Sequence, residues 1–479
     1  MAGRQPNIVW IQCDDMSRDV ATYGRTPGVS TPNIDRLAQE GMRFDRAYST
    51  APTCAPSRSA QLTGHYMTAV NGQHHHSTPE YPPHVKHLAE RLKDVGYFPA
   101  NISKNKPGLP EIGWGKLDYC WDRNTADEFY DSDDYADLAP NQPFYAEFQT
   151  IEPHLPWHSL EKYAEVGLAV DPAEVELPPF YPDTPETREE WARYLSDVQV
   201  FDAKVGMVIQ MLEEDGLLED TIIVLVADHG RDMVRAKFAL YDDGIHIPLV
   251  MRIPEKYQPE GYTPGEATDV LFSGVDIVPT LLATLGMDVP ADLPGIPAFG
   301  PDRSERTHAF AHRDRVGSHI DRSRAVVSER YHYVRNFMPN QPGYWPAALY
   351  PDFQLAYDKI LDTMIQMRGE GTLTPEQESV VAEYRPEEEL FDLHADPHTM
   401  HNVADDPAHQ DALREMQTAM RNWISSTQDK GFLPEDPAEA QKGAWVVPLW
   451  LQLTKGEYDV DNYDVYALPV DDAFRDMLR

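Results

Sequence analysis

The sequence predicts an α/β protein with a large, mostly parallel sheet flanked by helices, followed by a smaller α+β domain with an antiparallel sheet. Over the first 300 residues, short apolar runs of strand length alternate with helical patterns, as in a parallel sheet with helices on its faces. After this point the pattern changes to a hairpin and a surface helix. A chain of 479 residues is also longer than one ordinary domain. We therefore expect one domain at 1–300 and a second at 301–479.

The elements of the larger domain can be justified in order. "NIVWIQ" (7–12) is a continuous apolar run, typical of a buried strand. "TPNIDRLAQEGM" (31–42) predicts a helix with Thr31 as its N-cap, Pro32 in the first turn and a glycine at the end. The residues after Cys54 can open another helix, because proline is tolerated in a first turn. Further strands are expected at 143–149, 221–227 and 247–253, helices at 85–96 and 197–218, and an exposed acidic loop at 125–142.

The smaller domain has three recognisable segments. "RAVVSERYHYVRNF" (324–337) predicts an antiparallel hairpin, because two β-rich runs flank a short polar turn. "EELFDLHADPHTMHNV" (388–403) predicts a strand followed by a turn, and "AHQDALREMQTAMRNWISST" (408–427) an amphipathic surface helix.

Charge and cysteine content exclude several classes of protein. The chain has 79 acidic and 41 basic residues, a net charge of -38, and such a surface repels nucleic acid and anionic membranes. No stretch has the roughly 18 apolar residues of a membrane span. Cys13, Cys54 and Cys120 cannot form a disulfide framework, and "MAGRQP" leads straight into the first strand rather than into a signal peptide. We expect a cytoplasmic protein without nucleic-acid or membrane partners, with a protein whose leader has been removed as the alternative; the oligomeric state stays open.

Acids and a histidine follow two of the predicted strands. Asp14 and Asp15 come after the first strand, and Asp228 and His229 after the strand at 221–227. Because ligands gather at the carboxyl ends of parallel strands, these side chains predict a divalent cation site. The helix start at Cys54 attracts anions, and a guanidinium four residues later adds positive charge. Together these features predict a site for a sulfate or phosphate ester.

The segment "CAPSRSAQLTG" (54–64) resembles the C-x-P-S-R-x-x-x-x-T-G signature of type I sulfatases, and the resemblance covers nearly the whole chain. It implies an alkaline-phosphatase-like sandwich whose catalytic domain is 1–300. It also implies that a formylglycine-generating enzyme oxidises Cys54 to formylglycine during maturation. The hydrated aldehyde has one hydroxyl that can attack sulfur and a second through which sulfate can leave, so catalysis is covalent with a release step.

The same resemblance assigns roles to individual residues. Asp14, Asp15, Asp228 and His229 would hold the cation together with the modified Cys54. His154 in "EPHLPW" would protonate the leaving group. The developing negative charge would be neutralised by three cations: Arg58, Lys104 and Lys237.

Two positions depart from the family pattern. Many members have asparagine where this chain has His229; we expect Ca²⁺, with Mn²⁺ as the alternative because imidazole suits a borderline metal better. The family's Gly-Lys-x-His reads Ser-Lys104-Asn-Lys106 here, so a lysine replaces the histidine that assists sulfate release. Either burial lowers the pKa of Lys106 so that it acts as the base, or Lys106 only binds sulfate and a histidine of the run 73–76 takes the proton. We favour the second possibility, with His74 as a substrate-contacting candidate.

The sequence thus predicts a metal-dependent hydrolase of sulfate esters or sulfamates. Its flanks, including "YHYVRNFMPNQPGYW" (331–345), are similar to the heparan N-sulfatase (sulfamidase) branch, which implies a sulfated amino sugar of a larger glycan as substrate. One alternative is a phosphonate monoester or phosphodiester hydrolase of the same superfamily. The pair Asp14–Asp15 favours a sulfatase over it, since those relatives usually lack the second acid. The other alternative is a catalytically silent protein that binds sulfate or sugar.

Overall fold

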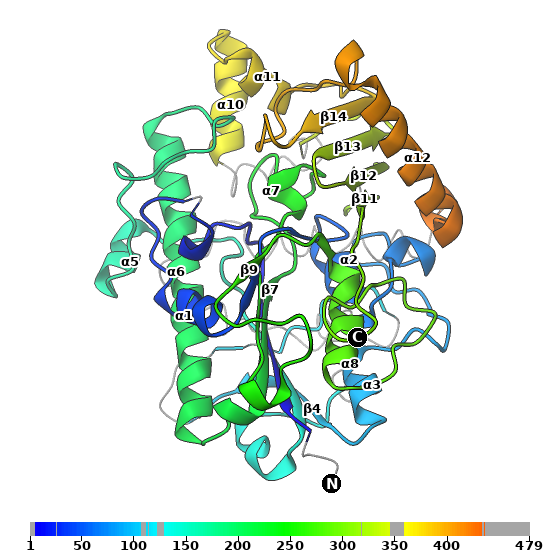
Figure 1. Cartoon of the computed structure of the whole chain (residues 1–479). Coiled ribbons are helices and arrows are strands. Elements are labelled where there is room, and N and C mark those ends of the chain that lie inside the picture. The colour runs from blue at the N-terminus through cyan, green and yellow to red at the C-terminus, as the bar shows by residue number, and fades with distance from the viewer. Residues whose placement is uncertain are drawn as a thin grey trace.

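The computed structural model describes residues 5–24, 26–106, 112–113, 115–121, 129–317, 319–344, 359–433 and 435. An eight-stranded sheet forms the centre of the molecule (Figure 1). Its strands, in spatial order, are β5 (Ser132–Asp134), β4 (Phe98–Lys104), β6 (Phe144–Gln149), β1 (Asn7–Cys13), β7 (Thr221–Ala227), β8 (Leu249–Arg252), β2 (Met42–Phe44) and β9 (Ala267–Thr268).

The first five strands in this order run parallel, and β8 is antiparallel to both of its neighbours. All residues of β1 and β7 are buried, which explains why both read as continuous apolar runs rather than alternating ones. The predicted mostly parallel sheet is confirmed. The four runs expected at 7–12, 143–149, 221–227 and 247–253 are its strands β1, β6, β7 and β8.

Helices cover both faces of the sheet (Figure 1). On one face α6 (Pro185–Glu214) packs against α1 (Pro32–Glu40) and α10 (Lys359–Glu370). On the other, α2 (Cys54–Thr63) packs against α8 (Ile277–Thr284). The remaining helices are α3 (Leu88–Lys93), α5 (Leu160–Glu165), α7 (Asp242–Ile245), α11 (Pro375–Val380) and α12 (Gln410–Thr427).

The start of α1 differs from its prediction. Thr31 is the N-cap residue but its side chain caps no backbone N–H. Instead, the carboxylate of Asp202 on α6 accepts from the backbone N–H groups of Asn33 at 3.1 Å and Ile34 at 2.8 Å. Burial raises the pKa of Asp202 to about 6. A carboxylate at a helix N-terminus satisfies free N–H groups, so a residue far along the chain serves as the cap.

The acidic segment at 125–142 is not simply an exposed loop. Residues 125–128 lie outside the described part. From 129 onward the segment contains strand β5, and Tyr130 and Tyr135 are buried. The exposed-loop prediction is therefore wrong for this part, because its aromatic side chains enter the core while its acids stay outside.

A separate four-stranded antiparallel sheet lies beyond the carboxyl ends of the parallel strands (Figure 1). α12 packs on it through Leu413, Met416 and Met420. The expected hairpin and surface helix are thereby confirmed. The strands are β11 (Ala309–Arg313), β12 (Ser323–Val327), β13 (Tyr331–Asn336) and β14 (Glu388–Asp392). A separate two-stranded parallel pair is formed by β3 (Ala47–Tyr48) and β10 (Phe272–Ser273).

Within the described residues, none of the helices combines the length and apolar character required to traverse a lipid bilayer.

Candidate active site

The carboxyl ends of β1 and β7 meet at the centre of the large sheet. Cys13, the last residue of β1, is in register with Ala227, the last residue of β7. The residues that follow therefore emerge side by side, and the start of α2 lies against them. The structure brings together one ligand-type atom from each of five buried residues, all within 4.8 Å of one another: Asp14, Asp15, Cys54, Asp228 and His229. We refer to these five residues as the cluster.

Two backbone features allow this convergence. Asp15 has a left-handed conformation with φ of 60°, which is costly for most residues and is tolerated at functional sites. Gly230 follows the cluster on the other strand, and a Cβ atom there would lie 1.8 Å from the carbonyl oxygen of Asp243. Only glycine allows the loop after β7 to approach that backbone.

The donor set fits a divalent cation. The Nδ1–H of His229 donates to the carbonyl of Gly230 at 2.9 Å, which leaves Nε2 with its lone pair directed at the cluster. That Nε2 lies 3.3 Å from Asp15 Oδ1 and 3.6 Å from Asp228 Oδ2. Asp14 Oδ1 and Asp15 Oδ1 are buried without a hydrogen-bond partner among the described residues. An imidazole oriented by a second hydrogen bond and carboxylate oxygens without donors are what a metal site presents.

The negative charges of the cluster also favour binding of a cation. Burial raises the pKa of Asp15 well above its usual value, and the nearby carboxylate of Asp14 adds to this. Burial and Asp14 likewise raise the pKa of Asp228. Burial also acts on Asp14, but Lys116 and Arg58 outweigh it and hold the pKa of Asp14 well below its usual value. Three buried carboxylates repel one another, and a divalent ion would stabilise their charged forms.

Arg58 is enclosed by the cluster rather than open to a ligand. Its Nε donates to Asp228 at 3.0 Å, its Nη2 lies 3.4 Å from Asp14, and its Nη1 donates to Gln149 at 2.6 Å. The side chain is completely buried. Arg58 therefore positions two of the carboxylates and offsets part of their charge.

Cys54 begins α2 and points at the cluster, with Sγ 3.2 Å from Nε2 of His229. Burial raises the pKa of its thiol well above the usual value. Because the thiolate is the reactive form of cysteine, an unmodified Cys54 would be a poor nucleophile in this place. The site thus fits a residue whose thiol is converted to another group.

Lys237 and His154 lie on one side of the cluster. Lys237 Nζ donates to Asp15 at 2.7 Å and to Asp232 at 3.1 Å, and it lies 3.3 Å from His154 Nε2. Burial lowers the pKa of Lys237, but Asp15 and Asp232 outweigh it and the pKa is raised, so this lysine stays charged. Burial and Lys237 lower the pKa of His154 to about 4. Lys237 and His154, both assigned to the site from the sequence, thus lie beside the cluster, and Asp232 is an additional neighbour of Lys237.

A second lysine that contacts the cluster, Lys116, is one that sequence reasoning missed. Lys116 donates to Asp14 and lies 3.3 Å from Asp118 Oδ2, and Asp118 Oδ1 lies 3.3 Å from Nδ1 of His76. Residues 115–118 read Gly-Lys-Leu-Asp, which matches the family's Gly-Lys-x-His except for the last residue. That pattern was the available signal. From the sequence alone, the pattern is placed at residues 103–106 instead, where only the lysine matches.

Three residues predicted from the sequence lie elsewhere in the structure. Lys104 is 63% exposed and pairs with Asp133 at 2.9 Å. Lys106 pairs with Asp215 at 2.8 Å and Glu214 at 3.3 Å. His74 is buried against Arg315, Gln73 and Glu435, where burial lowers its pKa to about 3. Among the described contacts none joins these three residues to the cluster. For the two lysines the reason is that β6 separates β4 from β1 and that acidic side chains away from the cluster bind both ammonium groups.

We expect Lys116→Ala to lower kcat/KM by about a hundredfold or more, since removing one positive group that faces developing charge has effects of that size. Lys104→Ala should cause a much smaller loss. Steady-state hydrolysis of a chromogenic aryl sulfate measures both, with the exposed Lys256→Ala, paired with Asp220, as the matched control. A larger loss for Lys104→Ala than for Lys116→Ala would contradict the structural assignment.

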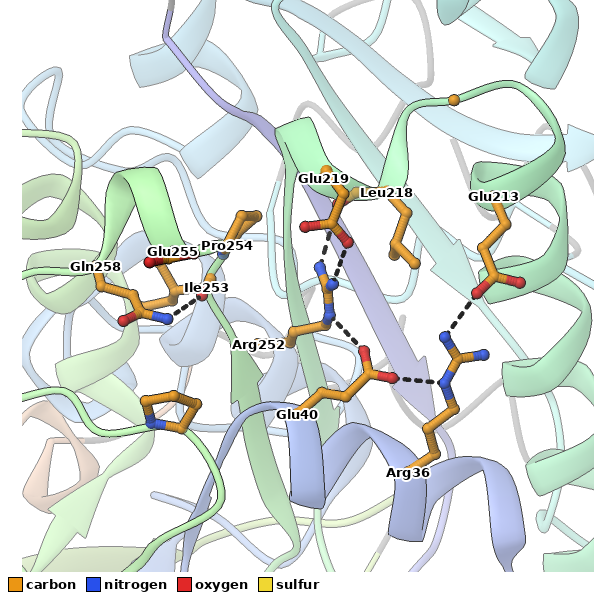
Figure 2. A pocket seen from close by; sticks show the side chains of 12 residues that line it. Arg36, Glu40, Glu213, Leu218, Glu219, Arg252, Ile253, Pro254, Glu255 and Gln258 are labelled. Carbon is orange, nitrogen blue, oxygen red and sulfur yellow. Dashed lines mark hydrogen bonds and ion pairs between the residues drawn. The ribbon is translucent and has the colours of Figure 1, made fainter.

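A second hollow, of about 520 Å³, lies at the opposite edge of the sheet. Figure 2 shows that its charged side chains are connected to one another: Glu213 contacts Arg36, Glu40 lies between Arg36 and Arg252, and Arg252 contacts Glu219. Each of the two arginines there has two carboxylate partners, so the described lining offers no unmatched positive charge for an anionic ligand. The cluster remains the better candidate site.

Comparison with known proteins gives an independent assessment. The family model described as Sulfatase matches residues 6–287. An ulvan-active sulfatase of Formosa agariphila is 30% identical over 484 residues, covering 90% of this chain and 76% of that protein. Human N-sulphoglucosamine sulphohydrolase is 23% identical, with 92% of this chain and 94% of that protein covered.

Solved structures share the fold. A protein determined in complex with its substrate D-glucosamine-2-N,6-O-disulfate superposes with a TM-score of 0.60 at 16% identity, covering 90% of this chain and all (100%) of that one. This similarity extends over both sheets, and at this level of identity it describes the architecture alone.

Proposed function

The chain belongs to the sulfatase family, and from this premise we propose that it removes sulfate, as ester or sulfamate, from an amino sugar of a sulfated polysaccharide. The observation that carries the proposal is the surrounding of Cys54: four metal-type ligands lie within 4.8 Å of it, and the ammonium groups of Lys116 and Lys237 contact Asp14 and Asp15. In a chain of net charge -38, a site that gathers cations is specific for an anionic substrate.

Members of the family carry a divalent cation and a formylglycine made from the signature cysteine. The hydrated formylglycine supplies a hydroxyl nucleophile, and the cation makes that hydroxyl more acidic. In this chain Asp14, Asp15, Asp228 and His229 would hold the cation next to residue 54. We propose Ca²⁺ as the ion, since three carboxylates are hard oxygen ligands. Mn²⁺ is the alternative that the imidazole of His229 favours.

The flanking residues bind the sulfate and move its protons. Burial lowers the pKa values of Lys116 and Lys237, but the neighbouring carboxylates together outweigh it, so both pKa values are raised and both groups stay charged. They would hold the oxygen atoms of the sulfate group. His154 donates through Nδ1 to the carbonyl of Leu155 at 2.5 Å, which directs Nε2 toward Lys237 and the substrate side. A sulfate ester beside this imidazole favours its protonated form, which can then donate a proton to the leaving oxygen or nitrogen.

The proton taken up during sulfate release needs an acceptor other than Lys106. His76 is a suitable group, since it is in contact with Asp118 and its pKa is lowered by burial, so its ring is neutral at pH 7. An aspartate paired with an imidazole orients the ring and stabilises its protonated state. We propose His76 in place of His74 as the histidine of the 73–76 run that serves the reaction.

We expect kcat/KM for an N- or O-sulfated glucosamine to exceed that for a phosphonate monoester. Both acids of the pair Asp14–Asp15 belong to the cluster, which favours a sulfatase over the related phosphonate hydrolases. Relatives named for ulvan and for N-sulphoglucosamine support a saccharide. Parallel kinetics on the two substrate classes, with sulfate and phosphonate release quantified by ion chromatography, measure the preference. Faster hydrolysis of the phosphonate would overturn this proposal.

A further inference from the structure

A cavity of about 140 Å³ lies between the loop after β7 and the smaller antiparallel sheet. No residue of the cluster is among the described residues that line it. Its walls come from the β7 loop through Arg235 and Tyr241, and from the second sheet and its connections through Arg385, Glu389 and Asn402.

Arg235 is the unusual residue of this cavity. It is 7% exposed, its Nη2 donates to the carbonyl of Thr399, and its guanidinium lies 3.9 Å from the ring centre of Tyr241. Its Nε has no hydrogen-bond partner, and in the described part of the chain no carboxylate reaches it within ion-pair distance. A buried charge that lacks an ion-pair partner is costly, so the cavity has room for a closer counter-charge than the chain itself supplies.

The neighbouring carboxylates compensate Arg235 only in part: Glu389 interacts with its charge electrostatically but forms no ion pair with it. Asp321 is shared by two arginines, Arg385 at 2.7 Å and Arg313 at 3.2 Å. Glu389 accepts hydrogen bonds from Tyr241 at 3.1 Å and from Asn336 at 2.8 Å, and burial raises its pKa. Three guanidinium groups thus face two carboxylates. The chain as a whole has an excess of acids, so a local shortage of negative charge points to a binding site rather than to composition.

We propose that this cavity binds one small oxyanion, a carboxylate or a sulfate group, against the guanidinium of Arg235. The volume is several times the roughly 30 Å³ that one water molecule occupies in the liquid, which is enough for such a group. Asn402 lines the same wall, and its amide nitrogen, which donates to the carbonyl of Glu388 at 3.1 Å, has a second N–H that can donate to an anion. Tyr384, which is 70% exposed, lies at the rim and offers an aromatic face to whatever carries the anion.

The oxyanion can come from two sources. Resting on the proposed function, the first is a second anionic group of the saccharide that is being hydrolysed, since sulfated polysaccharides carry several such groups. Arg235 is only two residues from Lys237, so one loop would contact both the reacting sulfate and this second group. The other source is a free inorganic anion. The chemistry at Arg235 is the same in both cases.

The first experiment locates the anion directly. Crystals of the wild-type enzyme are soaked in selenate, a tetrahedral oxyanion, and anomalous scattering of selenium gives its positions. We expect one peak beside Arg235 and one beside Lys116 and Lys237. In Arg235→Gln the first peak should vanish and the second should stay, whereas the matched surface variant Arg303→Gln should retain both. Arg235→Lys, which keeps the charge, should show a weakened peak in the cavity and serves if the glutamine variant does not fold.

Absence of selenium from the cavity of the wild-type enzyme, while the site beside Lys237 is filled, would overturn the proposal. So would a cavity peak of undiminished height in Arg235→Gln.

The second experiment distinguishes the sources. A sulfated glucosamine is compared with a matched saccharide that carries one additional carboxylate or sulfate. If the saccharide supplies the anion, the additional group should raise kcat/KM roughly tenfold in the wild type, as expected for one charged hydrogen bond, and this ratio should fall to about one in Arg235→Gln. A ratio of one in the wild type, together with a selenium peak, supports the cavity but overturns the saccharide source. Failure of the wild type to hydrolyse either sugar would reject the proposed substrate and leave the selenate result standing.

Discussion

Replacing Cys54 with alanine is expected to lower kcat by about four orders of magnitude or more, the scale at which removal of a covalent nucleophile acts. The fold should stay intact, because the side chain is small and α2 keeps the packing of its other residues, all of which are buried. Aryl sulfate hydrolysis by matched amounts of wild-type and variant enzyme measures the loss, and circular dichroism checks the fold.

The matched control is Cys120→Ala, since Cys120 is equally buried but donates to the carbonyl of His74 away from the cluster. Its activity should stay close to that of the wild type. Mass spectrometry of the wild-type peptide containing Cys54 should show an aldehyde, in which two hydrogen atoms and sulfur are replaced by one oxygen. An active enzyme with an unmodified thiol at position 54, or a Cys54→Ala variant that still turns over, would contradict the assignment.

The second large effect is expected from the metal ligands. Asp228→Ala should abolish binding of the single divalent ion and lower activity by more than about a hundredfold, because loss of even an outer-shell partner of a metal ligand costs up to that factor. Asp228 also holds Nε of Arg58 and the backbone N–H of Asp15, so its loss releases several groups at once. Elemental analysis of purified wild-type and variant enzyme measures the ion directly and identifies it.

Asp202→Asn is a matched control, since Asp202 is a buried carboxyl that caps α1 and makes no contact with the cluster. This variant should keep its metal and lose only a modest amount of stability, about 1 kcal/mol for a weakened cap. Retention of a full complement of metal in Asp228→Ala would contradict the site.

Acidification should release the ion from the wild type. Metal ligands must be deprotonated to bind, and burial raises the pKa values of Asp15 and Asp228. Protons therefore compete for these carboxylates at a higher pH than for ordinary aspartates, and metal affinity should fall as the pH drops from neutral toward and through the ordinary range of about 4. Competition against a chelator across this pH range measures the effect.

Much of the fold and the metal ligands could be read from local patterns. The strands at 7–12 and 221–227 are continuous apolar runs. Parallel strands that are buried on both faces have this pattern, because neither face contacts water. The carboxyl ends of these two strands are neighbours in the sheet, so the acids and the histidine that directly follow them had to converge. The signature that begins at Cys54 likewise lies almost entirely within one helix. In a helix, the spacing of two residues along the sequence determines their relative positions in space.

The residues that only the tertiary structure decided are those whose partners lie far along the chain. Lys104 stands where the lysine of the family's Gly-Lys-x-His pattern is expected, yet β6 lies between its strand and β1, and its ammonium pairs with Asp133. Lys116 reaches Asp14 across 102 positions, and Arg235 lies in its cavity because the second sheet closes over it. A local sequence pattern determines whether a segment forms a helix or a strand and which of its faces is buried. The distance between two charged side chains on different elements depends on how those elements pack. Burial then decides whether a lysine remains a solvated surface group or becomes part of a site.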